Sequence, residues 1–190
     1  MRTISWMSVF CVVLTIQIVD PMVMLAQQPA TATHVPNADI VAVFESLNGS
    51  IDKQVRVVDI GSDTNVGVGI LQRRQTDTEG EEVGAILHHQ VAEVYYVVSG
   101  SGVLVTGGES SGDHEFPSTS PVVTELLGPS GRRVIRNGQT QVISAGDVVV
   151  IPAGVPHGFR HIEDSITYLS IRVDPDQVLP AGYANPVLGH

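Results

Sequence analysis

The chain has 190 residues, of which 43% are apolar and 16% are charged, so we expect one well-buried domain rather than two of ordinary size. Its formal net charge of −10 argues against nucleic acids and anionic membrane surfaces as partners, because both attract basic proteins. The acidity itself indicates little more than solubility.

Residues 1–26 have the composition of a secretory signal sequence, with a basic residue near the start and a long apolar segment after it. Cleavage is expected after Ala26 or after Ala32. The alternative is an uncleaved membrane anchor, but Asp20 and Pro21 interrupt the apolar run before it is comfortably long enough to span a bilayer. We therefore expect an exported protein, periplasmic or secreted, with no stable membrane insertion after cleavage.

The only cysteine of the chain, Cys11, lies inside this signal segment. The mature chain would contain no cysteine. Thiol nucleophiles, disulfides and thiolate metal ligands are therefore excluded together.

Residues 27–36 are rich in Pro, Ala and Thr and predict a flexible leader. From Asn37 onward apolar residues recur at helical spacing, and Asn37 or Asp39 can cap the start while Gly49 can end the segment. These features predict one short amphipathic helix that packs on the outside of a sheet.

The rest of the chain alternates short β-branched segments with Gly, Asp and Ser, which predicts an all-β barrel or sandwich. The polar, turn-rich residues 107–121 predict a surface insertion that forms a lid or a rim. The expected strands are residues 54–60, 65–73, 83–90, 93–98, 102–105, 122–127, 134–137, 141–144, 147–151, 157–160 and 165–173.

Residues 146–161 combine a buried strand, a stiff turn and two histidines. Pro152 and Gly154 turn the chain after the apolar strand, and Pro156 restricts it again. His157 and His161 follow at an even spacing, so they share one face if the segment is extended. A histidine held by such a turn is well placed to bind a metal ion.

Residues 84–102 contain the second group of candidate ligands, His88, His89 and Glu93. Imidazole and carboxylate side chains together suit a divalent transition metal. Taken alone, such residues are more often ordinary rim residues. The prediction of a metal site is stronger because the chain also contains the histidines of residues 146–161.

Together the two stretches resemble the cupin superfamily. Glu93 and Gly100 fit the end of the family's first motif, in residues 84–100. The second motif, in residues 146–161, is matched at every spacing by Gly146, Pro152, Gly154 and His157. The resemblance implies one cupin domain over residues 37–190, with the double-stranded β-helix fold, a jelly-roll barrel.

The chain departs from the family pattern in both motifs. When residues are counted back from Glu93, the second histidine of the family's first motif falls on His89. The first histidine of that motif falls on Leu87. Strand alternation favours His89 as the inward residue over His88, although a bend before Glu93 would reverse this choice. His161 replaces the terminal asparagine of the second motif, which leaves it as a residue of the second shell, a ligand or an outward side chain.

By resemblance, one ion of iron, manganese, nickel, copper or zinc is expected, held by His88 or His89 with Glu93 and His157. If only one of His88 and His89 points inward, it forms with His157 and Glu93 the two-histidine, one-carboxylate set used in iron(II) oxygen chemistry. If both point inward, the set becomes the three-histidine, one-glutamate set of the family. Weak or absent metal binding is a third outcome. The family also implies a small-molecule ligand and a homodimer.

Other inward positions carry less information. Tyr95 and Val97 share a face with Glu93, and Phe159 shares one with His157, so all three are expected in the barrel core. Tyr95 is also a candidate for orienting a substrate or donating a proton. Arg160 and Arg172 are expected to be charged residues of the rim or surface. The alternative is that they anchor an acidic substrate.

The expected activity is metal-dependent chemistry on a small organic molecule, with an oxygenase first and an isomerase or lyase second. The alternative is a non-catalytic module that binds or senses a carbohydrate or an aromatic compound. A structural or storage role is a third interpretation, since one fold of this kind hosts many functions.

Overall fold

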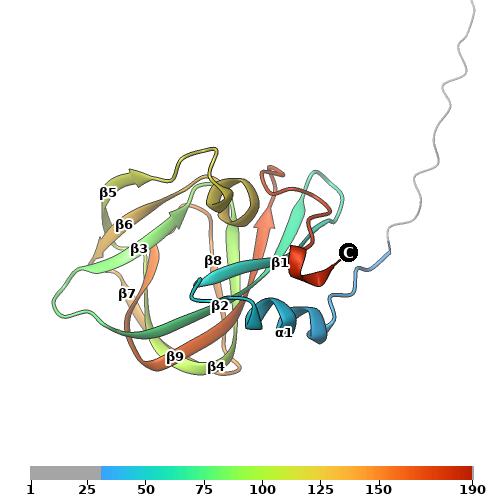
Figure 1. Ribbon diagram of the computed structural model, residues 1–190. Helices are drawn as coiled ribbons and strands as arrows, with labels where there is room; N and C mark the ends of the chain where they lie inside the picture. Colours follow the sequence, from blue (N-terminus) through green and yellow to red (C-terminus); the bar gives the residue numbers. More distant parts are fainter. Residues whose placement is uncertain (1–30, 190) are drawn as a thin grey trace, which may run out of the picture. The chain divides into compact units, whose positions relative to one another are not determined.

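The computed structural model describes residues 31–189, so the predicted signal sequence and residues 27–30 of the predicted leader lie outside the described residues. Within the described part, nine strands, a short α-helix and two short helices of other types form the domain (Figure 1). In chain order they are α1 (Asn37–Glu45), β1 (Asp52–Asp59), β2 (Asn65–Asp77), β3 (Val83–His88), β4 (Ala92–Thr106), β5 (Glu109–Glu115), the π-helix η1 (Val122–Leu127), β6 (Ser130–Arg136), β7 (Gln139–Ser144), β8 (Val148–Ile151), β9 (His157–Asp174) and the 3₁₀-helix η2 (Pro186–Leu188).

The strands form two antiparallel layers because β4 and β9 are long enough to take part in both. One layer has the order β1-β2-β9-β4-β8 and uses the first half of β4 and the second half of β9. The other has the order β5-β6-β3-β9-β4-β7 and uses their opposite halves. The predicted fold class, an all-β barrel with a short N-terminal helix, is confirmed.

The helix α1 covers the outer face of one layer, where Val43 packs against Val55 and Ile70 in a small buried cluster. Asn37 and Asp39 do not cap it as predicted, because the cap residue is Pro36 and makes no side-chain hydrogen bond. Asp39 instead accepts a hydrogen bond from Arg56 at 3.0 Å, which ties the helix to β1.

Several predicted boundaries change. Residues 93–98 and 102–105 belong to the single strand β4, and residues 157–160 and 165–173 to β9. The prediction of a strand at residues 122–127 is wrong, because this segment is η1: its buried residues Val123 and Leu127 are four apart and therefore lie on one face of a helix. The segment 107–121 contains the exposed strand β5, which pairs with β6.

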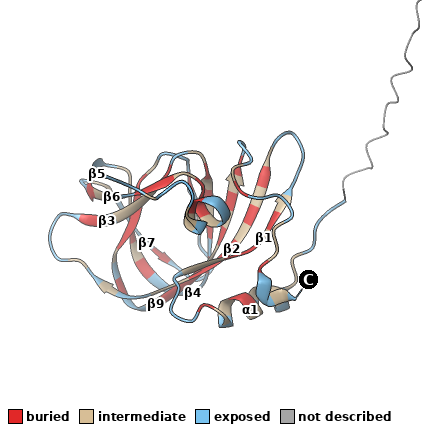
Figure 2. Cartoon of the chain, turned by 45° about the horizontal axis from the view of Figure 1, so that its top comes forward, coloured by how far each residue is buried: buried red, intermediate tan, exposed pale blue. Residues whose placement is uncertain are grey.

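Aromatic and aliphatic side chains form the main core cluster of the barrel. Figure 2 shows buried residues, in red, along most of its strands. The ring centroids of Tyr95 and Tyr168 lie 4.3 Å apart, and Phe159 lies 6.1 Å from Tyr168. The inward positions predicted for Tyr95, Val97 and Phe159 are thus confirmed. The candidate metal ligands lie beside this packed core.

No helix between residues 31 and 189 is both long enough and apolar enough to cross a membrane.

Candidate metal centre

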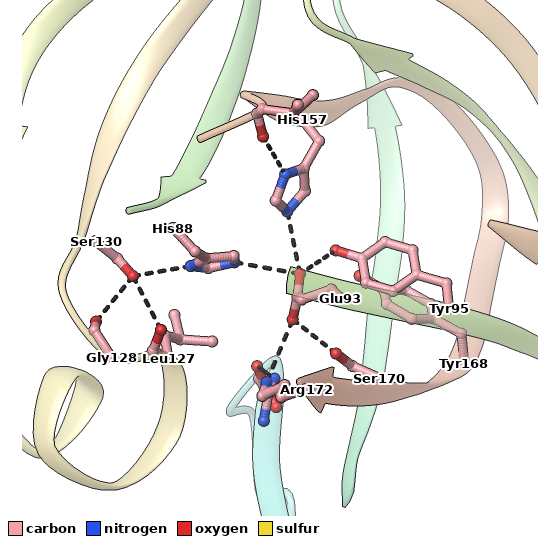
Figure 3. Close-up of polar contacts among 12 residues, drawn as sticks. His88, Glu93, Tyr95, Leu127, Gly128, Ser130, His157, Tyr168, Ser170 and Arg172 are labelled. Atoms are coloured by element: carbon pink, nitrogen blue, oxygen red, sulfur yellow. Dashed lines mark hydrogen bonds and ion pairs between the residues drawn. The ribbon is translucent and has the colours of Figure 1, made fainter. Parts of the chain in front are cut away.

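Three strands bring the candidate ligands together (Figure 3). His88 ends β3, Glu93 lies near the start of β4, and His157 begins β9. The Nε2 atoms of His88 and His157 each lie 3.2 Å from Oε2 of Glu93, and the three ligand atoms lie within 4.8 Å of one another. Their exposed fractions are 3% for His88 and 2% for Glu93 and His157, so the cluster is buried.

The turn before β9 positions both histidines. The peptide N–H of Gly154 donates to the carbonyl of His88 at 2.7 Å, which joins the second motif to the end of β3. Gly154 has a φ of +79°, a conformation that favours glycine. The N–H of Val155 donates to the carbonyl of Pro152 at 3.2 Å and closes the turn. The stiffness predicted from Pro and Gly therefore has a structural basis.

Hydrogen bonds fix which ring nitrogen of each histidine carries the proton. Nδ1 of His157 lies 3.0 Å from the carbonyl oxygen of Val155, which can only accept, so Nδ1 is the protonated nitrogen. Nδ1 of His88 lies 2.8 Å from Oγ of Ser130. The hydroxyl of Ser130 donates to the backbone carbonyl of Leu127 or Gly128, so its oxygen accepts from His88.

In the neutral histidines the Nε2 lone pairs therefore both point at the same carboxylate oxygen. Three lone-pair atoms this close repel one another unless a cation lies among them. Nε2 of His157 is accordingly a buried atom without a hydrogen-bond partner. Metal-bound histidines use their second nitrogen in the same way, as a donor to a carbonyl, hydroxyl or carboxylate.

The spacing of these atoms suits one metal ion. Two ligand atoms about 2.1 Å from a common ion, at angles of about 90–110°, are about 3.0–3.4 Å apart. Both measured Nε2–Oε2 distances, 3.2 Å, fall in this range. The residues thus fit a two-histidine, one-carboxylate site for a divalent transition metal, and their chemistry does not single out one of the candidate ions.

Glu93 is held on both carboxylate oxygens. Oε2 accepts from the Tyr95 hydroxyl at 3.0 Å, while Oε1 accepts from Oγ of Ser170 at 2.6 Å and from Nε of Arg172 at 3.2 Å. Burial would raise the pKa of Glu93, but its polar neighbours His88, His157 and Arg172 hold it well below its usual value. Glu93 is therefore ionised.

Burial lowers the pKa of His88, against the opposing effect of Glu93, so this histidine is stabilised in the neutral form that binds metals. Burial and the nearby Glu93 carboxylate raise the pKa of Tyr95 well above its usual value. Tyr95 therefore stays protonated and serves as a fixed donor to Glu93.

Arg172 is fully buried, so its prediction as a rim or surface charge is wrong. Its guanidinium group crosses β2 and donates to Oε1 of Gln54 and Oδ2 of Asp52, as well as to Glu93. Burial raises the pKa of Asp52 to about 6, although Arg172 opposes this effect. The centre thus continues into a buried polar network that ends on β1.

Two glycines of β2 make room for this arrangement. A Cβ atom on Gly69 would lie 2.5 Å from Nη1 of Arg172, and one on Gly67 would lie 2.2 Å from Nε2 of Gln54. Both side chains therefore occupy space that a larger residue at either position would fill.

The preference for His89 as the inward histidine is wrong. His88 is inward, whereas His89 is 42% exposed and its Nε2 lies 2.9 Å from Glu115 on β5. The alternation of side chains between two faces does not apply here, because the chain leaves the β-conformation between His88 and Ala92. The face of a residue in β3 therefore cannot be inferred from the face of Glu93 in β4.

His161 is not part of the second shell. Its side chain is 46% exposed, and its Nδ1 lies 3.3 Å from Asp77 on the outer surface. The even spacing from His157 fails to predict the face because β9 is irregular between Phe159 and His161. Leu104 pairs with Phe159, whereas its neighbour Val103 pairs with His161, so β9 has one extra residue there and its next buried side chain is Ile162. Arg160 donates to the carbonyl of Gly80 and lies away from the ligands.

Sequence reasoning missed Ser130, Ser170, Asp52 and Gln54. Serine at a turn or in a strand carries no signal of its own, and the network to β1 joins residues far apart in the sequence. One signal was available: the alternating glycines of β2 indicate that a large side chain lies across that face of the strand.

The family comparison agrees with the sequence motifs. Residues 130–171 match the family described as Cupin domain, which covers β6 to most of β9 and includes His157. The resemblance to cupins is thereby confirmed. A comparison with curated proteins gives no match.

Several solved structures are similar to this chain at low sequence identity and low TM-score. A protein from Bacillus halodurans, BH2720, is 17% identical over 83% of this chain and 94% of its own, with a TM-score of 0.44. The DMSP lyase DddQ from Ruegeria pomeroyi is 13% identical over 75% and 56%, with a TM-score of 0.40. A cupin protein from Bacteroides fragilis is 19% identical over 63% and 72%, with a TM-score of 0.35. These similarities are too weak to assign a substrate or a reaction to this chain.

Proposed function

We propose that this chain, which carries a cupin domain, binds one divalent transition metal through His88, Glu93 and His157 and uses it for chemistry on a small organic molecule. The observation that carries the proposal is the convergence of two unprotonated imidazole nitrogens on one ionised carboxylate oxygen. An oxygenase is the first expectation and an isomerase or lyase the second.

A bound metal would supply Lewis acidity, or oxygen activation in the case of iron(II). The chain's own residues prepare the site for it. Ser130 and the carbonyl of Val155 fix the histidine tautomers, and Ser170 and Arg172 hold Oε1 of Glu93 so that Oε2 faces the histidines. Tyr95 keeps its proton and donates a hydrogen bond to Oε2 of Glu93, which helps to hold this oxygen in place.

A non-catalytic binding or sensing module is the second candidate. The nearly complete burial of the three ligands favours it, because a reacting molecule needs a path to the metal. Turnover therefore requires an opening motion, whereas a structural metal in a binding module does not.

A calorimetric titration with zinc tests whether the protein binds a metal ion through these residues. His157→Ala and His88→Ala are expected to lower the affinity at least a hundredfold, because each removes a ligand. The exposed histidines supply matched controls: His161→Ala and His89→Ala are expected to leave the affinity unchanged. Equal affinities in all four variants would contradict the proposal.

A second test addresses the reaction. A two-histidine, one-carboxylate site leaves positions for exogenous ligands. Nitric oxide should therefore bind the iron(II)-loaded protein and give the electron paramagnetic resonance signal of a ferrous nitrosyl. Absence of this signal in iron-loaded protein would favour the binding module.

We propose a homodimer formed through the outer face of β4 and β8. Tyr96, Val98, Val148 and Val150 are exposed there, and among the described strands β8 pairs only with β4, so its outer edge is free to pair with β8 of a second copy. Light scattering should give a dimer for the wild type and a monomer for Val150→Lys. A monomeric wild type would refute this interface.

Export remains a proposal that rests on the composition of residues 1–26. Mass spectrometry of the protein recovered from the periplasm or the medium should give a chain beginning after Ala26 or Ala32. A cytoplasmic, full-length chain would contradict it.

A further inference from the structure

A cavity of about 540 Å³ lies between β7 and β8. Each of these strands pairs with β4, one in each layer, and among the described strands they do not pair with each other. The barrel is therefore open between them. Pockets for small molecules have volumes of about 300–1,000 Å³, so the cavity is large enough for a small organic ligand.

The side chains that β7 and β8 contribute to the lining lie on the inner face of the barrel. Gln141 is opposite Leu104 of β4, a fully buried residue of the barrel core, and opposite residues of an antiparallel pair lie on one face. Gln139 is two residues away in the same strand and shares this face. Val149 of β8 packs against the same core. The cavity is therefore an opening of the barrel interior and not a hollow on its outer surface.

This opening adjoins two of the three candidate metal ligands. In the pairing of β4 with its neighbours, the lining residue Thr106 is opposite His157, and the lining residue Ile151 is opposite Glu93. The Cβ atoms of opposite residues are about 4.5–5.5 Å apart. The carbonyl of Val155, which also lines the cavity, accepts the hydrogen bond of His157 at 3.0 Å. A molecule in the cavity thus lies on the side from which the metal centre can be approached.

The lining is polar along β7 and apolar along β8, and none of its residues is charged. The side-chain amides of Gln139 and Gln141 are exposed and make no hydrogen bond to another residue of the range 31–189. Each amide offers both a donor and an acceptor. Val149, Ile151 and Pro152 form the apolar part of the lining. The cavity therefore suits a ligand that has hydrogen-bonding groups on one side and carbon atoms on the other.

The charged residues that are nearest in sequence to the lining have partners elsewhere. Arg136 forms an ion pair with Glu82 and lies opposite Glu109. Asp147 accepts hydrogen bonds from the backbone N–H and the hydroxyl of Ser144. A charged ligand would thus lose hydration in the cavity without gaining an ionic partner. Hydroxyl groups carry no charge and both donate and accept, so they match the free amides.

We propose that this cavity binds an uncharged, hydroxylated molecule of the size of a monosaccharide and leads it to the metal centre. The hydroxyl groups exchange hydrogen bonds with Gln139 and Gln141, and the C–H face of the sugar ring packs on Val149 and Ile151. The role of this ligand as a substrate rests on the proposed metal function, whereas its binding does not. In the proposed homodimer, a second copy at the edge of β8 would border the same opening.

Four probes with the same six-membered ring test the selection in metal-free protein. Glucose, 6-amino-6-deoxyglucose and glucuronate carry a neutral, a positive and a negative group at the same carbon atom, and tetrahydropyran-2-methanol lacks the ring hydroxyls. Calorimetry or amide chemical shifts should show glucose binding about fivefold tighter, or more, than each of the other three. Equal binding of the three sugars, equal binding of glucose and the tetrahydropyran, or no binding of any probe would overturn the assignment.

A charge placed in the lining locates the bound sugar. Gln141→Lys adds a cation there, so it should raise the affinity for glucuronate about fivefold and lower that for 6-amino-6-deoxyglucose by a similar factor. Gln75 on β2 is also exposed and lies outside the lining, so Gln75→Lys is the matched control and should keep the wild-type ranking. The same ranking in both variants would show that the sugar does not bind in this cavity.

Nuclear relaxation tests whether the bound sugar lies beside the metal centre. Wild-type protein is loaded with manganese(II), which is paramagnetic, or with zinc, which is not, and unbound ions are removed. The protons of glucose should relax faster with the manganese protein than with the zinc protein. Equal relaxation would overturn the link between the cavity and the centre. Glucose binding by a protein that takes up no metal would support the cavity and contradict the proposed metal function, so the two failures are distinguishable.

Discussion

The substitution Gly69→Ala tests whether Arg172 must lie across β2 to hold the centre together. The new Cβ atom would lie 2.5 Å from Nη1, 3.1 Å from Cζ and 3.3 Å from Nη2 of Arg172. Carbon and nitrogen atoms in ordinary contact are about 3.5–4.0 Å apart. The guanidinium group must therefore move by about 1 Å or more.

This movement is costly because Arg172 is fully buried and bonded to Glu93, Gln54 and Asp52. Overpacking of a core costs about 1–3 kcal/mol, and breaking a buried ion pair costs about 3–5 kcal/mol. Partial loss of these contacts should thus lower the free energy of unfolding by about 2–4 kcal/mol. Because Glu93 loses a fixed partner, metal affinity should fall about 10–100-fold.

Urea denaturation of metal-free protein measures the first effect and zinc calorimetry the second. Gly84→Ala on β3 is the matched control, since a Cβ atom there meets no atom within 4 Å. This control is expected to be neutral or slightly stabilising. If Gly69→Ala is as stable as Gly84→Ala and binds zinc equally well, the position of Arg172 across β2 is not needed to hold Glu93 in place.

The buried network also predicts a pH dependence and a tautomer effect. The pKa of Asp52 rises from 3.8 to about 6 on folding, so between these pH values the folded state holds a proton that the unfolded state has lost. The contribution of Asp52 to the stability of metal-free protein should therefore fall by about 3 kcal/mol as pH rises through this window, and Asp52→Asn should remove that fall in urea titrations. An unchanged pH profile in Asp52→Asn would contradict the assignment. Ser130→Ala removes the acceptor that fixes the tautomer of His88 and should weaken zinc binding about tenfold with little change in fold by circular dichroism. Wild-type affinity in this variant would show that Ser130 has no such role.

The turn of the second motif was predictable because its conformation is set locally. Pro152 and Gly154 restrict the backbone wherever they occur, and the apolar run before them forms the strand β8. The prediction that this strand is buried is wrong, because Val148 and Val150 lie on its exposed outer face and only Ile151 is buried. His157 could therefore be placed on the inner face from the sequence alone.

The first motif was only half predictable. Its residues were identified, but the choice between His88 and His89 depended on a break in the strand that only the packed structure reveals. A similar limit applied to η1, whose apolar composition suits a strand and a helix equally well.

The buried network around Arg172 could not be predicted, because it depends on pairing between distant strands. Arg172 and Asp52 are 120 positions apart in the sequence, and their contact requires β2 to lie between β1 and β9. A single arginine in a polar-apolar alternation gives no sign that it will be buried.

Elemental analysis of anaerobically purified wild-type protein tests the central claim most directly. The geometry of His88, Glu93 and His157 predicts one bound iron, manganese, nickel, copper or zinc ion per chain. Protein that contains no transition metal, and that takes up none when these ions are supplied, would contradict the account.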